Sequence, residues 1–151
     1  MRAASTPDRT GLVFVGQRSG GPEGSHRARI RAVQEHLSCF AGGMLGLGGR
    51  LLGRKQDLAT AIELTESAVW SYQSTATGVM PEIMEFYSAN DPSRWRYSED
   101  KGDGVTATTT ARQKGLPLGV SSQVATQYQG RPEAIESVFY MYRITGDPVW
   151  Q

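Results

Sequence analysis

The sequence predicts an all-α fold with a few short β-strands. Apolar residues recur at spacings of three and four over residues 32–53, 57–73 and 132–145, the period of a helix buried on one side. Residues 11–16 instead form a short apolar run between turn residues, as a strand does. Hydrophobic residues make up 38% of the 151, so we expect a modest core and one domain, or a piece of a larger one.

The first predicted helix, over residues 32–53, is rich in glycine. Each glycine in a helix interior costs roughly 0.5–1 kcal/mol relative to alanine. Such a helix needs close neighbours to hold it, so we expect it to pack tightly inside a larger helical body. Its predicted inner stripe is His36, Phe40, Met44, Leu47 and Leu51, and its glycines are Gly42, Gly43, Gly46, Gly48 and Gly49.

The second predicted helix covers residues 57–73 and begins at Asp57, a residue type that suits an N-cap. Only the short segment Arg54-Lys-Gln56 separates it from the first helix. Two helices joined so briefly should pack antiparallel as an αα-hairpin. The predicted inner stripe of the second helix is Leu58, Ala61, Ile62, Thr65, Val69 and Tyr72.

The remaining segments carry weaker signals. Residues 1–10 and 17–30 are expected to be poorly ordered, and residues 75–90 look extended after a Thr-Gly stop. Residues 91–117 are predicted to be loop, because Asp-Pro, Gly-Asp-Gly and a threonine-rich run punctuate them. Residues 120–128 are either a short strand or an irregular approach to the last helix.

The last helix combines clear end signals with two acidic residues. Pro132 suits the first helical position, and Gly146 ends the helix. Glu133 and Glu136 lie one turn apart near the positive end of the helix dipole, which favours their ionised forms. Held carboxylates suit a general base, although ordinary first turns are also acidic. The predicted apolar stripe is Ile135, Val138, Phe139 and Tyr142.

The sequence gives little support to nucleic-acid binding, membrane insertion or nucleotide binding. A net charge of +1 gives no reason to expect a nucleic-acid or membrane-surface partner. No apolar run approaches the roughly 18–20 residues of a membrane span, and the first residues lack the apolar stretch of a signal peptide. Gly48 and Gly53 have the spacing of the outer P-loop glycines, but Arg54-Lys55 follow where Lys-Ser/Thr is required.

His36 and Cys39 stand three residues apart, so a metal pair or a cysteine nucleophile is conceivable. No second cysteine or histidine lies at ligand spacing from them. This favours a histidine at a helix start and a cysteine packed as a small hydrophobe. With one cysteine in the sequence, no internal disulfide is possible.

Three blocks in order carry a resemblance to a known family. The first is His36-Leu-Ser-Cys-Phe-Ala-Gly-Gly-Met44. The second is Leu64-Thr-Glu66, followed by Tyr72 and then by Thr77-Gly-Val-Met-Pro-Glu82. The third is Arg131-Pro-Glu-Ala-Ile-Glu-Ser137, followed by Tyr140-Met-Tyr-Arg-Ile-Thr-Gly-Asp147. Through them the chain resembles the class I α-1,2-mannosidases, glycoside hydrolase family 47, over most of residues 11–151.

The resemblance implies a segment of an (α/α)7 barrel, with residues 1–151 forming part of the catalytic domain. It implies inverting hydrolysis of α-1,2-linked mannose from high-mannose N-glycans, with a bound Ca²⁺, in the endoplasmic reticulum or Golgi or after secretion. Glu133 matches the family's general base. Arg131, Glu136, His36 and Glu82 match residues that bind the sugar, and Glu133 and Glu136 would contact the metal through water.

The sequence also departs from the family pattern. The blocks that carry the family's acid and its direct Ca²⁺ ligand, a threonine, have no match in this chain, so we expect no direct metal ligand here and no activity from the isolated chain. The cysteine that pairs with the one matching Cys39 is replaced by Ala68, and Gly130 stands where a bulky apolar residue is usual. Two alternatives remain: a non-catalytic, lectin-like relative that recognises misfolded glycoproteins, and an unrelated helical interaction module.

Overall fold

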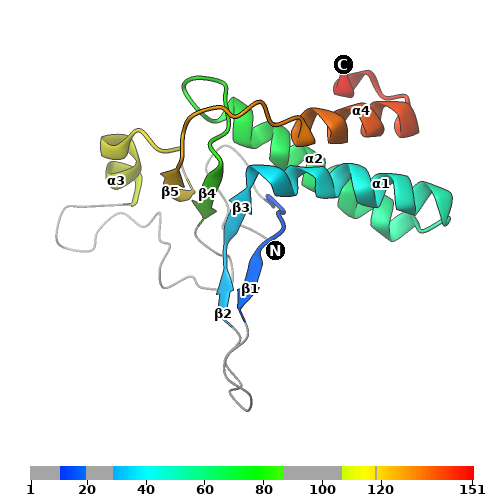
Figure 1. Cartoon of the computed structure of the whole chain (residues 1–151), viewed down its shortest axis with the longest axis horizontal. Helices are drawn as coiled ribbons and strands as arrows, with labels where there is room; N and C mark the ends of the chain where they lie inside the picture. Colours follow the sequence, from blue (N-terminus) through cyan, green and yellow to red (C-terminus); the bar gives the residue numbers. More distant parts are fainter. Residues whose placement is uncertain (1–10, 20–28, 87–106, 118) are drawn as a thin grey trace, which may run out of the picture.

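A computed structural model describes residues 11–19, 29–86, 107–117 and 119–151. Three helices pack together at one end of this structure, and a small sheet with a fourth helix lies at the other (Figure 1). The described part is thus mostly helical. Its helices are α1 (Ala41–Leu51), α2 (Lys55–Gln73), α3 (Ala107–Lys114) and α4 (Glu133–Thr145), with the 3₁₀ turns His36–Phe40 and Pro148–Trp150; its strands are β1 (Gln17–Ser19), β2 (Arg29–Arg31), β3 (Val33–Glu35), β4 (Ile83–Phe86) and β5 (Val120–Val124).

The predicted αα-hairpin is confirmed, and glycines form its interface. A Cβ atom at Gly42 would lie 2.3 Å from Thr65 Oγ1, and one at Gly49 would lie 3.0 Å from the backbone nitrogen of Leu58. The residue numbers run in opposite directions along these contacts, so α1 and α2 are antiparallel. Because the glycines of α1 present no side chain to α2, the two backbones approach closely, as the glycine content predicted.

The buried face of α1 is not the one predicted. Its apolar stripe turns outward: Met44 is 55% exposed and Leu51 is 75% exposed. The first half of the predicted helix is also different, because residues 33–35 pair with β4 as a strand and residues 36–40 form a 3₁₀ turn. Helix α1 buries four glycines instead, namely Gly42, Gly43, Gly46 and Gly49.

Helix α4 packs across α1 through small and polar residues. The Ser137 hydroxyl accepts a hydrogen bond from the Gly43 backbone N–H (2.9 Å) and donates one to the Cys39 carbonyl (2.6 Å). The predicted stripe is again wrong, since Ile135 is 65% exposed and Phe139 is 58% exposed. The buried face consists of Ala134, Ser137 and Met141, which recur at the same helical period. Gly146, with a left-handed φ of 69°, ends the helix as predicted.

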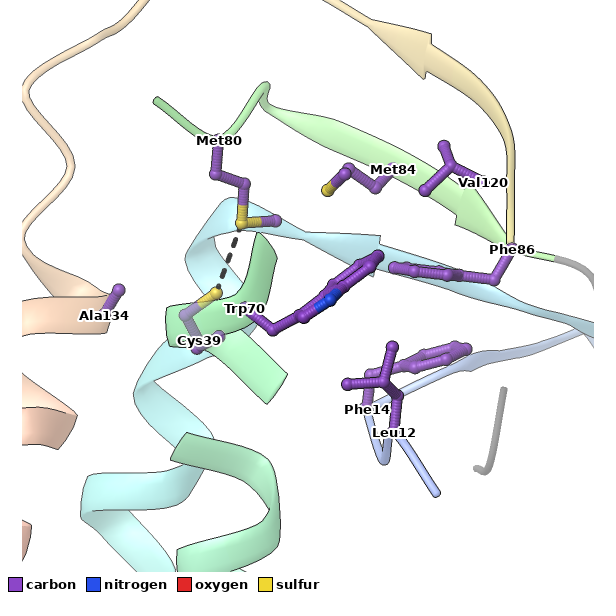
Figure 2. Packing of buried hydrophobic residues seen from close by; sticks show 10 residues of the cluster. Leu12, Phe14, Cys39, Trp70, Met80, Met84, Phe86, Val120 and Ala134 are labelled. Carbon is purple, nitrogen blue, oxygen red and sulfur yellow. Dashed lines mark hydrogen bonds between the residues drawn. The ribbon is translucent and has the colours of Figure 1, made fainter. Parts of the chain in front are cut away.

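Strands β3, β4 and β5 form one antiparallel sheet in that order, and β1 and β2 form a separate hairpin. The core lies between this sheet and the helices, where aromatic and methionine side chains meet (Figure 2). Phe14 stacks on Phe86 with ring centroids 4.5 Å apart, and Trp70 lies 6.1 Å from Phe86. Burial of such rings supplies much of a domain's stability.

Several smaller expectations changed in the structure. Residues 11–16 are buried at 12–14 but form a single bridge rather than a strand. Residues 107–114, predicted as loop, form α3, whose C-terminal turn carries Arg112 and Lys114 and closes at left-handed Gly115. Asp57 lies within the first turn of α2 and pairs with Arg54 (2.9 Å) instead of capping it.

Other expectations fall partly outside the described residues. The extended and loop predictions over 87–106, and the poor order predicted for 1–10 and 20–28, cannot be compared with a described structure. At both ends of residues 20–28 the chain is ordered, because Gln17–Ser19 and Arg29–Arg31 form the paired strands β1 and β2. The prediction of poor order is wrong for these residues. The strand alternative for 120–128 is confirmed by β5. In the part that the structure describes, no helix has the length and apolar character needed to cross a bilayer.

Candidate active site

Five side chains from four parts of the chain converge beside the first turn of α4. His36 follows β3, Tyr72 lies near the end of α2, Glu82 precedes β4, and Arg131 and Glu133 stand at the start of α4. The sheet register places β3 beside β4, with Glu35 opposite Ile83. The His36 backbone N–H then donates to the Glu82 carbonyl at 2.9 Å. Strand pairing therefore brings together residues that are 46 positions apart in sequence.

An arginine and a carboxylate form the charged centre of this cluster. The Arg131 guanidinium donates to both Glu82 oxygens, with Nε 3.2 and 3.1 Å away and Nη2 2.9 Å from Oε2. The Glu82 side chain is only 13% exposed. Hydrogen bonds from Arg131 lower the pKa of Glu82, which is therefore ionised at neutral pH. A paired guanidinium of this kind is held in one orientation.

His36 is fully buried beneath this ion pair. Its Nε2 shares a hydrogen bond with the Tyr72 hydroxyl, and its Nδ1 lies 3.5 Å from Glu82 Oε1 without forming a hydrogen bond. Burial lowers the pKa of His36, and the neighbouring Glu82 carboxylate only partly opposes that shift. Burial also raises the pKa of Tyr72 to about 12. At neutral pH the pair is thus a neutral imidazole and a protonated phenol, and His36 contacts Tyr72 and Glu82 rather than solvent.

Glu133 is the first residue of α4 and points into the same cluster. Its charge contributes to the pKa shifts of His36, Arg131 and Tyr72, which places it near all three. Its Oε2 is buried and has no hydrogen-bond partner. A buried carboxylate oxygen normally has a partner. This oxygen is therefore available to a water molecule, a sugar hydroxyl or a cation, and a carboxylate in that position can accept a proton from water.

Glu136, one turn further along α4, is exposed. The structure records no hydrogen bond or ion pair between it and the cluster in the described part of the chain. Over the described residues there is also no group of three or more histidine, cysteine or acidic side chains that could hold a metal ion. A hard cation such as Ca²⁺ needs six to eight oxygen ligands. Within the described residues, the partnerless oxygen of Glu133 is an oxygen of the kind that such a cation prefers.

The structure brings four of the five predicted site residues together: Glu133, Arg131, His36 and Glu82. Tyr72 and Tyr128 join them, although the sequence pattern assigned neither to a site. Tyr72 was placed in a helix stripe, and Tyr128 near a possible strand end. The Tyr128 ring lies 6.1 Å from the His36 ring. Helical and strand periodicity contain no signal for this contact, because it joins the 3₁₀ turn after β3 to the irregular segment after β5.

Cys39 belongs to the hydrophobic core. It is a free thiol, 4% exposed, with its Sγ 3.7 Å from Met80 Sδ and 3.3 Å from Gln34 Nε2 (Figure 2). Burial raises its pKa to about 11. A thiol that stays protonated is a poor nucleophile and a poor metal ligand. The interpretation of Cys39 as a small buried hydrophobe is therefore supported.

Known proteins are similar to this chain in sequence and in fold. The sequence model of glycosyl hydrolase family 47 matches residues 1–151. A mannosyl-oligosaccharide α-1,2-mannosidase of Coccidioides posadasii is 31% identical over 98% of this chain and 24% of its own length. A mannosyl-oligosaccharide 1,2-α-mannosidase of Arabidopsis thaliana is 31% identical over 91% of this chain and 22% of its own.

A solved structure of an α-1,2-mannosidase is also similar to this chain. The α-1,2-mannosidase from Trichoderma reesei superposes with a TM-score of 0.59 at 28% identity, covering 81% of this chain and 23% of that protein. The chain thus spans about a quarter of the length of the relatives it matches. Since the family match extends over all 151 residues, the chain belongs to glycosyl hydrolase family 47.

Proposed function

We propose that this chain is the part of an α-1,2-mannosidase that carries the general base, and that the intact protein removes α-1,2-linked mannose from high-mannose N-glycans. The supporting observation is Glu133, a carboxylate with a buried, partnerless oxygen beside an ordered Arg–Glu pair. The names of the family relatives support the substrate class. The glycine-mediated helix contacts are consistent with a segment of an (α/α)7 barrel, in which helices crowd together.

The proposed reaction inverts the configuration of the sugar. Glu133 takes a proton from a water molecule, whose oxygen attacks the anomeric carbon from the face opposite the glycosidic bond. The bond to the leaving oxygen breaks as a second carboxylic acid protonates that oxygen. The two carboxyl groups of an inverting enzyme stand roughly 6.5–9.5 Å apart to admit the water. The second group has no match in this sequence, so the isolated chain should not turn over substrate.

The other residues hold the base and the sugar in place. Glu82 fixes the Arg131 guanidinium, whose unused N–H donors can bind sugar hydroxyls. Fully buried His36 and half-buried Tyr72 form a neutral support beside Glu82. Glu136 is proposed to bind the sugar from the solvent side. Preorganised donors and acceptors of this kind stabilise charge as it develops in the transition state.

Ca²⁺ is the proposed cofactor of the intact protein. Glu133 would contact it through water, as the partnerless Oε2 allows, and the direct ligand would come from outside this segment. A bound calcium ion would supply a fixed positive charge and a set of oriented waters and hydroxyls. The proposed substrate, an N-glycan of a glycoprotein, places the protein in the endoplasmic reticulum or Golgi or outside the cell.

The experiment replaces the base in the full-length protein. Glu133→Gln should reduce release of mannose from a high-mannose glycan by about 10²–10⁴-fold while leaving glycan binding intact, because only proton transfer is removed. Asp57→Asn is the matched control: it neutralises a carboxylate at the far end of the helix hairpin and should leave turnover unchanged. Turnover of Glu133→Gln within about threefold of wild type would exclude Glu133 as the base.

A further inference from the structure

Tyr128 is an exposed aromatic ring fixed at the edge of the cluster. Its side chain is 55% exposed, and its hydroxyl donates to the Arg131 carbonyl at 3.2 Å. Its ring centroid lies 6.1 Å from that of buried His36, at an interplanar angle of 43°. The hydroxyl end is therefore tethered to the cluster while much of the ring remains open to solvent. Neither the family resemblance nor the proposed mechanism assigns this residue a role.

The surroundings of this ring match the two surfaces of a sugar. A pyranose has hydroxyl groups along its edge and C–H groups on its faces. The hydroxyls suit the carboxylate of Glu133 and the guanidinium of Arg131, and the C–H groups suit the electron-rich face of an aromatic ring. Charged hydrogen-bonding groups beside an exposed tyrosine thus provide both kinds of contact at one place.

The backbone between the ring and the arginine leaves room for a ligand. Gly130 has a φ of +70°, and a Cβ atom there would meet no heavy atom within 4 Å. A bulky apolar side chain, which the family resemblance leads one to expect at this position, would occupy that open space. Its absence keeps the approach from Tyr128 to Arg131 clear.

We propose that Tyr128 is a stacking platform that binds one pyranose ring of the glycan and helps to select it. The proposal rests on the proposed function for the identity of the sugar. Tyr128 is a binding residue: its ring contacts the substrate, whereas Glu133 acts on the attacking water. A family member with an aliphatic residue here would bind the same sugar more weakly.

Binding, rather than turnover, tests the platform. Binding of α-1,2-mannobiose to the 151-residue chain is measured by ligand-observed NMR, which detects affinities in the millimolar range. Tyr128→Leu should weaken binding by between about 3-fold and 10-fold, and Tyr128→Phe, which keeps the ring, should stay within about twofold of wild type. Tyr142→Leu makes the same change more than two turns along α4 from Glu133, and it should leave binding unchanged.

The outcomes separate this proposal from the mannosidase proposal. Equal binding by Tyr128→Leu and wild type, or no binding of the disaccharide by the wild-type chain, overturns the platform. The loss of turnover in Glu133→Gln would stand in either case. If the α-1,2-linked glucose disaccharide binds as tightly as mannobiose and still depends on Tyr128, the platform is supported and its selection of mannose is refuted. Circular dichroism of each variant confirms that the helices are retained.

Discussion

Gly42 packs closely against the second helix of the hairpin, so Gly42→Ala is a direct test of how this fold is held together. The added Cβ would lie 2.3 Å from Thr65 Oγ1, 3.2 Å from the Thr65 nitrogen and 3.3 Å from the Ala61 carbonyl oxygen. Thr65 is fully buried, and its hydroxyl donates to that same carbonyl at 2.8 Å. The methyl group therefore meets a hydrogen-bonded side chain and backbone rather than a flexible chain end.

The expected free-energy change follows from three contributions. Replacing glycine by alanine stabilises a helix by roughly 0.5–1 kcal/mol. Overpacking a filled interface costs about 1–3 kcal/mol. Displacing the Thr65 hydroxyl sacrifices a buried hydrogen bond, at about 0.5–1.5 kcal/mol. The variant should therefore be destabilised by about 1–3 kcal/mol, despite its better helix propensity.

Gly48→Ala is the matched control on the same helix. No heavy atom lies within 4 Å of the position its Cβ would take, so only the gain in helix propensity remains, about 0.5–1 kcal/mol. Urea unfolding followed by far-UV circular dichroism, with a stabilising osmolyte if needed, measures both variants. With an m-value near 2 kcal/mol per M, their midpoints should differ by roughly 1–2 M. If Gly42→Ala is as stable as Gly48→Ala, the close packing is not what holds the hairpin.

Three further predictions concern the core and the ion pair. Ala68→Cys should let Cys39 form a disulfide under oxidising conditions, because both positions lie in one buried cluster. Thiol titration should then find no free thiol, and the free energy of unfolding should rise by about 2–4 kcal/mol. Two remaining thiols would contradict this prediction. In the wild type, Cys39 should react with a thiol reagent only after unfolding, because burial raises its pKa to about 11; rapid reaction of the native chain would refute that placement. The lowered pKa of Glu82 means that its ion pair stabilises the fold above the ordinary value of 4.5 and that this contribution is lost as pH falls through the folded pKa. Glu82→Gln should therefore lose less stability than wild type on acidification below that pH, and identical pH profiles would count against the ion pair.

The sequence indicated most of the candidate site but not how it is assembled. His36, Glu82, Arg131 and Glu133 were all identified from ordered blocks, and the structure places them in one cluster. What no block contained is the pairing of β3 with β4, which brings His36 against Glu82. Long-range strand pairing depends on the whole sheet, so the local pattern of either segment cannot specify it.

Helix faces show where pattern reasoning fails in this protein. The usual assumption is that large apolar residues point inward. In α1 and α4 the buried faces are instead built mostly from small residues, such as Gly43 and Ser137, with Met141 as the large apolar exception. Met44 and its apolar neighbours point outward. Small residues occupy those positions because they let the backbones of neighbouring helices approach closely. Which positions must be small can be identified only once the neighbouring helix is in place.

The amino-acid sequence by itself determined the helices α1, α2 and α4, the start of the last one beside Pro132 and its end at Gly146, and the family to which the chain belongs. These follow from local conformational preferences and from motifs that read along the chain. Only the tertiary structure decided which helix faces are buried, that residues 107–114 are helical, and that Tyr72 and Tyr128 flank the carboxylates. Those features depend on contacts between segments far apart in sequence. The free energy of such contacts depends on both segments, so neither segment specifies them alone.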